Sequence, residues 1–176
     1  MNRLPLKKHG FIYFDNAKEI QEKATHYGQL RTKTNANLHE IAPEYDRGDL
    51  AVAVDELGII AELIAIDFLK QENIPFTAVD VFEKEPVKTA DVFILDFKLD
   101  VKGVSAITEL RVNRRTHYQK DVSHYWFIKP EKNENNELTG KAEYWIVTAA
   151  CVTYWKSRKS FSEFFYKEIN EINNEE

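Results

Sequence analysis

The segment from Thr89 to Gly103 constrains the fold most, because charged residues interrupt its apolar run at regular intervals. This pattern indicates two short strands joined by a tight turn near residues 95–97, which together form a hairpin. In such a hairpin Asp91 on the first strand lies opposite Asp100 on the second. Lys102 follows Asp100 by two positions and therefore lies on the same face of the strand. The segment thus predicts two carboxylates and one ammonium group in a small volume.

Residues 49–71 carry the strongest helical pattern in the chain. Apolar residues recur on nearly every side of this helix, so we expect it to be buried on most sides. Glu62 is conspicuous among these apolar residues, and Gly58 lies one turn earlier on the same edge of the helix. Two interpretations stay open. Glu62 belongs to the polar site of the hairpin, or this edge of the helix faces water.

The rest of the sequence predicts a mixture of helices and strands. Asn16–Glu19 and Ser160–Glu163 have the capping-box spacing that begins helices. The expected elements are a helix over 16–30, a loop or irregular arm over 31–48, strands over 76–82, 90–95, 98–103, 123–128 and 141–153, a polar connection over 129–140, and a C-terminal amphipathic helix after residue 160.

This order of elements predicts one α+β domain, with a mixed central sheet flanked by helices. We place that domain at residues 49–176 and treat residues 1–48 as an N-terminal extension, in which an edge strand over residues 11–14 and a helix precede a loop. The three tryptophans, Trp126, Trp145 and Trp155, are expected in the core or at an interface.

Composition excludes only a few classes of protein. The net charge of -5 argues against a uniformly basic nucleic-acid binder, although a local basic patch remains compatible with it. The single cysteine, Cys151, cannot form an internal disulfide, and we expect it to be buried on a strand. Neither a signal peptide nor an apolar run long enough to span a membrane is recognisable, which predicts a cytoplasmic protein.

Residues 104–121 form the most basic window of this acidic chain. Arginine and lysine hold phosphate groups without reading base sequence, so this window predicts contacts with a nucleic-acid backbone. The alternative is a solvated helix or loop. The candidate residues are Arg111, Arg114, Arg115, His117 and Lys120, with Asn113 and Gln119 as assisting groups.

The acidic residues of the hairpin suit the hydrolysis of a phosphodiester bond. Mg²⁺ prefers hard oxygen ligands and keeps several waters, so two or three carboxylates suffice to bind it. Asp91 and Asp100 could share such an ion, with the Val101 backbone carbonyl as a third ligand and Glu62 as a direct or water-mediated one. Lys102 could then orient the attacking water or stabilise developing charge.

Two other interpretations of the acid and lysine pattern are open. Asp96 and Lys98 have the same Asp-x-Lys spacing and compete for the same role, although Asp96 would lie near the turn of the hairpin. Asp100 and Lys102 could instead be solvated residues on the polar face of a half-exposed strand.

The arrangement of an acidic residue on a helix, an aspartate at the second strand and Asp-x-Lys on the third resembles the PD-(D/E)xK nuclease superfamily. The resemblance covers roughly residues 55–128. It implies a restriction-endonuclease-like fold and a Mg²⁺- or Mn²⁺-dependent enzyme that hydrolyses DNA. It also implies that Glu62, Asp91, Asp100 and Lys102 form the active site.

The resemblance leaves the biological role open. Restriction, repair, junction resolution and phage or mobile-element functions all fit, and a homodimer is expected if both strands of DNA are cut. Two alternatives remain: a nuclease-fold protein without catalysis that binds within a nucleoprotein or phage assembly, and an unrelated α+β interaction domain.

Overall fold

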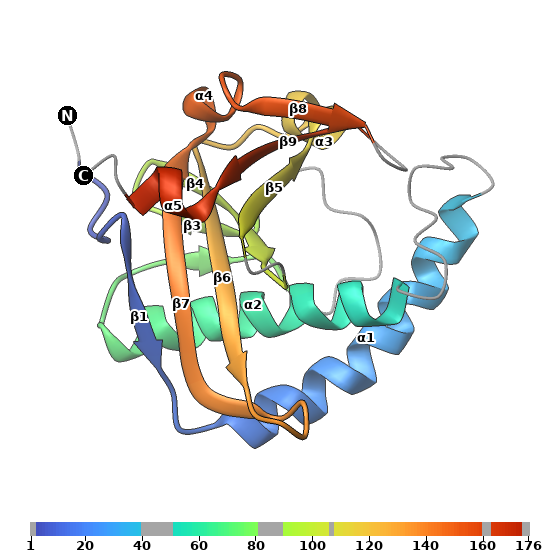
Figure 1. The fold of residues 1–176 in the computed structure, drawn as a ribbon. Coiled ribbons are helices and arrows are strands. Elements are labelled where there is room, and N and C mark those ends of the chain that lie inside the picture. Colours follow the sequence, from blue (N-terminus) through green and yellow to red (C-terminus); the bar gives the residue numbers. More distant parts are fainter. Residues whose placement is uncertain (1–2, 40–50, 81–89, 106–107, 160–162, 174–176) are drawn as a thin grey trace.

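The computed structural model describes residues 3–39, 51–80, 90–105, 108–159 and 163–173. Its helices and strands are packed as a central mixed sheet with helices on one face and a smaller sheet on the other (Figure 1). The predicted α+β class with a mixed sheet is therefore confirmed.

The central sheet has the strand order β1-β7-β6-β4-β3-β2. Strands β4 and β6 are parallel, and the other neighbouring strands are antiparallel. A parallel pair requires a crossover connection, and the chain between β4 and β6 supplies it. The bounds are β1 His9–Tyr13, β2 Thr77–Ala78, β3 Val92–Ile94, β4 Phe97–Gly103, β6 His124–Lys132 and β7 Leu138–Thr148.

Two long helices cover one face of this sheet, α1 (Ala17–His39) and α2 (Ala51–Gln71). As expected for a helix that is apolar nearly all round, α2 buries residues on several sides, including Ile59, Ile60 and Ile64. Helix α2 lies directly across β4: a Cβ atom added at Gly103 would stand 2.6 Å from the Leu57 carbonyl oxygen. The helix and the predicted hairpin are therefore in close contact.

The opposite face carries a second core, built around Tyr125, Phe127 and Trp145. A three-stranded sheet in the order β5-β9-β8 covers it. The elements on this side are β5 Glu109–Asn113, α3 Arg114–Gln119, α4 Ala149–Val152, β8 Lys156–Lys159, β9 Glu163–Glu168 and α5 Ile169–Asn173. The three tryptophans are buried, as predicted.

Several sequence predictions were wrong. The expected C-terminal helix is instead strand β9 followed by the short helix α5, and residues 160–162 of its predicted start lie outside the described residues. Pairing of β9 with both β5 and β8 overrides the local helical pattern. Helix α1 continues through residues 31–39, where a loop was expected, while residues 40–48 are not described.

Other expected strands have different lengths. Strand β2 is shorter than the predicted strand over 76–82, of which residues 81–82 lie outside the described part. Strands β6 and β7 extend into the predicted polar connection, and β7 ends at Thr148. Cys151, expected to be buried on a strand, is exposed on helix α4.

Elements of the expected N-terminal extension take part in the main fold. Strand β1 pairs with β7, and Ile12, Phe14, Ile20 and Ala24 belong to the core beneath the sheet. Within the described part of the chain, none of the helices is long and apolar enough to cross a membrane.

Candidate active site

The hairpin of β3 and β4 positions Asp91 at the start of β3. Val92 pairs with Leu99 in antiparallel register, which confirms the predicted hairpin. The backbone N–H of Asp91 donates to the Leu99 carbonyl at 2.9 Å, and the Val101 N–H donates to Asp91 Oδ2 at 2.7 Å. These bonds fix the Asp91 carboxylate beside the middle of β4, where Asp100 lies.

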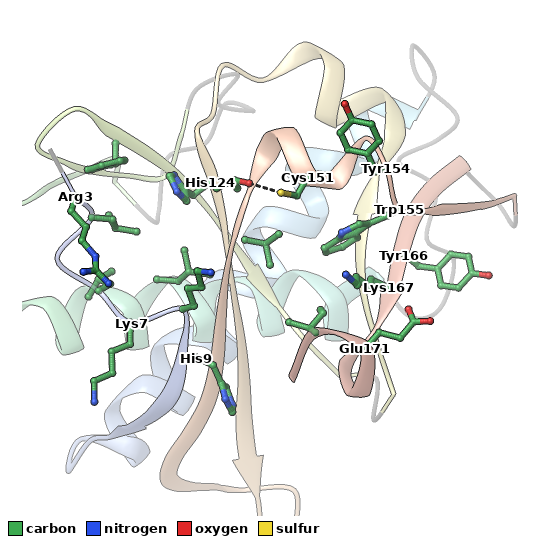
Figure 2. A pocket seen from close by; sticks show the side chains of 18 of the residues that line it. Arg3, Lys7, His9, His124, Cys151, Tyr154, Trp155, Tyr166, Lys167 and Glu171 are labelled. Carbon is green, nitrogen blue, oxygen red and sulfur yellow. Dashed lines mark hydrogen bonds between the residues drawn. The ribbon is translucent and has the colours of Figure 1, made fainter. Parts of the chain in front are cut away.

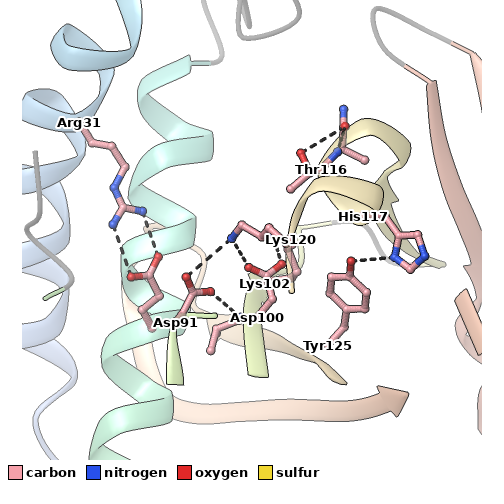
Figure 3. A network of polar contacts seen from close by, with 11 residues as sticks. Arg31, Asp91, Asp100, Lys102, Thr116, His117, Lys120 and Tyr125 are labelled. Carbon is pink, nitrogen blue, oxygen red and sulfur yellow. Dashed lines mark hydrogen bonds and ion pairs between the residues drawn. The ribbon is translucent and has the colours of Figure 1, made fainter. Parts of the chain in front are cut away.

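Asp100 is fully buried on β4 and contacts two lysines (Figure 3). Lys102, on the same face of the strand, pairs with Asp100 Oδ2. Lys120, which directly follows α3, donates a hydrogen bond to Asp100 Oδ1, and its ammonium group lies 3.9 Å from Asp91 Oδ1. Asp91, Asp100, Lys102 and Lys120 therefore converge, and Asp100 and Lys102 are not solvated residues of an exposed strand.

The two carboxyl groups differ in their affinity for protons. Burial raises the pKa of Asp91 from 3.8 to about 7, and the charge of Asp100 adds to this rise, although Lys120 and Lys102 act against it. Burial alone would also raise the pKa of Asp100, but the charges and hydrogen bonds of both lysines outweigh it and lower that pKa. Neighbouring acids whose pKa values are shifted in opposite directions are typical of functional sites.

Glu62 projects from α2 toward this site but is held by an arginine of α1. Arg31 donates to Glu62 Oε1 at 3.0 Å and to Oε2 at 3.4 Å. A Cβ atom at Gly58 would lie 3.5 Å from the Arg31 guanidinium, so Gly58 leaves room for this pair. The Glu62 side chain is only 16% exposed, and its charge contributes to the raised pKa of Asp91. The interpretation that this edge faces water was therefore wrong.

Tyr125 of β6 lies on the other side of Asp100. The Tyr125 hydroxyl and His117 Nδ1 are 2.8 Å apart and share a hydrogen bond. Burial and the charge of Asp100 both raise the pKa of Tyr125, while burial lowers the pKa of His117. A neutral phenol and a neutral imidazole thus stand next to the paired acids. Sequence reasoning missed Tyr125 and Arg31, because no local spacing links either residue to the hairpin.

The structure separates the residues of the basic window. Lys120 lies among the carboxylates rather than on an outer surface. Arg111 and Arg114 pair with acidic residues, Glu109 and Glu163 respectively, on the small sheet. Arg115 lies in helix α3 with Arg114 and His117, and α3 follows β5 directly.

The competing Asp-x-Lys pair does not meet Asp91. Lys98 forms its ion pair with Asp121, and Asp96 is exposed in the turn between β3 and β4. Within the described residues, the geometry therefore favours Asp100 and Lys102 over Asp96 and Lys98 as partners of Asp91.

The residues present fit a hard cation such as Mg²⁺ that takes only one or two of its ligands from the protein. Oxygen Oδ2 of Asp100 is buried and is paired with the ammonium group of Lys102, so a cation bound there would take the place of that ammonium group. The described residues contain no group of three or more His, Cys, Asp or Glu side chains that could hold a metal ion. Mg²⁺ is commonly held by one or two carboxylates, with water and substrate oxygens completing its shell, so Asp91 and Asp100 suffice.

Comparison with known proteins found no relative. No protein-family model, no curated protein and no solved structure matches this chain. The site must therefore be interpreted from its own geometry.

Proposed function

We propose that this protein is a Mg²⁺- or Mn²⁺-dependent nuclease of the PD-(D/E)xK type that hydrolyses DNA. The observation that carries the proposal is the convergence of Asp91, Asp100 and Lys102, because these are the residue types that metal-assisted phosphodiester hydrolysis uses. Their origin also agrees with the resemblance. The aspartate begins the second strand after α2, and Asp-x-Lys lies on the third strand.

The proposal includes a restriction-endonuclease-like core. Its support is the element order α2, β2, β3, β4, β5, α3 and β6, in which β5 belongs to the small sheet and β2, β3, β4 and β6 are neighbours in that order in the central sheet. The charge of Glu62, the acid on the preceding helix, acts on Asp91 and contributes to its raised pKa.

In this mechanism Asp91 and Asp100 would hold the cation, with the Val101 carbonyl as an additional candidate ligand. When bound, the cation supplies Lewis acidity to the scissile phosphate and lowers the pKa of a bound water. Lys102 lies at Asp100 and can hold the attacking water by hydrogen bonding. Lys120, between the two carboxylates, can contact the negative charge that accumulates on the phosphate oxygens.

Glu62 would enter this mechanism only after it leaves Arg31. While the pair is intact, the Arg31 guanidinium occupies both carboxylate oxygens of Glu62. We therefore propose that Glu62, once released, contacts the cation through a water molecule. His117 and the arginines of α3 would contact the DNA backbone at a distance from the reacting phosphate.

One observation favours the second candidate, a nuclease-fold binding protein without catalysis. Lys102 and Lys120 already neutralise Asp100, and Arg31 neutralises Glu62. A site balanced in this way is also what a purely structural ion-pair network would look like.

Cleavage assays separate the two candidates. Purified protein is incubated with plasmid, branched and single-stranded DNA in Mg²⁺ or Mn²⁺, beside Asp100→Asn and Lys102→Met. We expect metal-dependent cleavage that either change reduces by about 10²-fold or more. The matched controls are Asp96→Asn and Lys98→Met, which alter the competing Asp-x-Lys pair and should retain cleavage. Folded wild type that cleaves none of these substrates would favour the binding protein.

Two further properties are part of the proposal. Cutting both strands of DNA commonly takes two active sites, so we propose that the nuclease acts as a homodimer. The absence of a disulfide-forming cysteine pair in the sequence agrees with action in the cytoplasm.

A further inference from the structure

A pocket of about 760 Å³ lies apart from the carboxylates, where the N-terminal segment crosses the end of β7 (Figure 2). The backbone N–H of Ile146 donates to the Lys8 carbonyl at 2.7 Å, which holds that segment against the sheet. Helices α4 and α5 and strand β9 close the other side. Its volume is in the range of sites that bind small molecules or parts of larger ligands.

Positive charge dominates the lining of this pocket. Its basic side chains come from the N-terminal segment and from β8 and β9, namely Arg3, Lys7, Lys8, Lys156 and Lys167. Glu171 is the one acidic side chain among the described residues that line it, and Lys156 lies 3.1 Å from it. In a chain with a net charge of -5, this concentration of cations indicates an anionic ligand.

Aromatic and imidazole rings are interleaved with the cations. Tyr154 is 90% exposed at this pocket, and Trp155 and Tyr166 lie beside it. Phe97 and His124 line the far end, with their ring centroids 5.4 Å apart. Cationic groups that follow a phosphate backbone, together with rings on which bases stack, are the two components of single-stranded nucleic-acid binding.

The Phe97 end of the pocket and the candidate active site share strand β4. Phe97 is the first residue of β4, and Asp100 lies three residues further along the same strand. At about 3.3 Å per residue, their Cα atoms are separated by about 10 Å. Phe97 and Asp100 face opposite sides of the strand, so a nucleic acid that occupied both places would have to pass around the end of β4.

We infer that this pocket binds single-stranded nucleic acid, with phosphates on the lysines and a base on Tyr154. The inference rests on the proposed nuclease function and specifies its substrate: a strand end or single-stranded flank beside the bond to be cleaved. Mixed polar and apolar lining fits a nucleotide better than a purely apolar ligand, because His9, His124 and Thr148 are interspersed with the rings.

Binding can be measured without cleavage, because EDTA removes the free metal ions that hydrolysis needs and leaves the pocket intact. Fluorescence anisotropy of a labelled oligothymidylate is followed in EDTA as salt is raised. Lys7→Ala combined with Lys167→Ala should weaken binding and reduce the slope of log affinity against log salt by about 1.4, because each phosphate contact contributes about 0.7. The control combination, Lys18→Ala with Lys132→Ala, removes the same charge at exposed positions elsewhere and should leave the slope unchanged.

The stacking part of the inference has its own variant. Tyr154→Ala should weaken binding by about 5- to 100-fold, the effect expected for loss of one stacked base. Tyr13→Ala is the matched control, because Tyr13 is 64% exposed on β1 and does not line the pocket. It should bind as wild type does.

Cys151 offers an independent readout, because it is the single cysteine of the chain, is exposed and lines the pocket. Saturating oligothymidylate should slow its reaction with a thiol reagent several-fold. Absence of both binding and protection, equal losses in the control variants, or equal protection by a blunt duplex would each overturn the inference. Cleavage that depends on Asp100 would still stand in those cases, whereas oligothymidylate binding without any cleavage would overturn the proposed function alone.

Discussion

Replacing Asp91 with asparagine should stabilise the protein at neutral and alkaline pH. Asparagine retains a carbonyl oxygen that can accept the Val101 N–H, now accepted by Asp91 Oδ2 at 2.7 Å. It removes the carboxylate charge, which burial and the neighbouring Asp100 make unfavourable. The substitution thus separates the cost of the charge from the benefit of the hydrogen bond.

The magnitude follows from the pKa of Asp91. In the folded protein that pKa is about 7, against an ordinary value of 3.8. Each tenfold change in proton affinity corresponds to about 1.4 kcal/mol, so ionising Asp91 costs the folded state about 4 kcal/mol. Readjustment of the two lysines toward Asp91 reduces this value, and about 2–4 kcal/mol is the expected range.

The direction of the pH dependence follows from linkage. Between pH 4 and pH 7 the folded protein retains a proton on Asp91 that the unfolded chain has released. The stability that this retained proton contributes is therefore fully present below about pH 4 and is lost as pH rises through 7. The free energy of unfolding of Asp91→Asn should equal that of wild type near pH 4 and exceed it at pH 8.

Urea unfolding at pH 4 to 9 in EDTA measures this difference, with Asp96→Asn as the same chemical change at an exposed turn. A difference between Asp91→Asn and wild type that stays constant over this range would refute the reasoning.

A cation held by Asp91 and Asp100 would offset the repulsion between the two carboxylates. Mg²⁺ at about 100 times its Kd should therefore stabilise wild type at pH 8 by about 2.7 kcal/mol and stabilise Asp91→Asn less.

Three further predictions concern the surroundings of Asp91. Gly103→Ala should lower the free energy of unfolding by about 1–3 kcal/mol in urea titrations, because a Cβ atom there would stand 2.6 Å from a carbonyl oxygen of α2. Arg31→Ala should lower the free energy of unfolding by about 1–3 kcal/mol in the same assay, since it leaves the largely buried Glu62 without its partner at 3.0 Å. Adding Glu62→Gln to Arg31→Ala should restore part of that free energy, which a double-mutant cycle measures. Lys120→Met should raise the pKa of Asp91 further, because the Lys120 charge now lowers it; carboxyl NMR titration that finds no rise would contradict this.

Local patterns predicted the parts of the site that lie close together in sequence. Alternation over 89–103 was sufficient for the hairpin and for the approach of Asp91 to Asp100, because both depend on a single tight turn. The apolar periodicity of 57–71 was likewise sufficient for a buried helix. Both features are decided by neighbours within a few residues.

Features that depend on distant pairing could not be predicted in this way. Lys120 was expected on an outer, phosphate-binding surface, yet it joins Asp100 because β4 and β6 pair in parallel. The apolar residues Phe161, Phe164, Phe165, Ile169 and Ile172 have helical spacing, but residues 163–168 pair with β5 and β8 as a strand. In each case a tertiary contact outweighs the local preference of the segment.

The parallel pairing of β4 with β6 also has a kinetic consequence. Asp91 and Asp100 meet as soon as a local hairpin forms, which takes microseconds in isolated peptides. Lys120 reaches them only after the chain from Val104 to Ser123 has closed into a crossover, and closing such non-local pairs is slow. During folding the two acids and Lys102 are therefore together before Lys120 arrives. An acidic medium that protonates one of them should speed this stage of refolding.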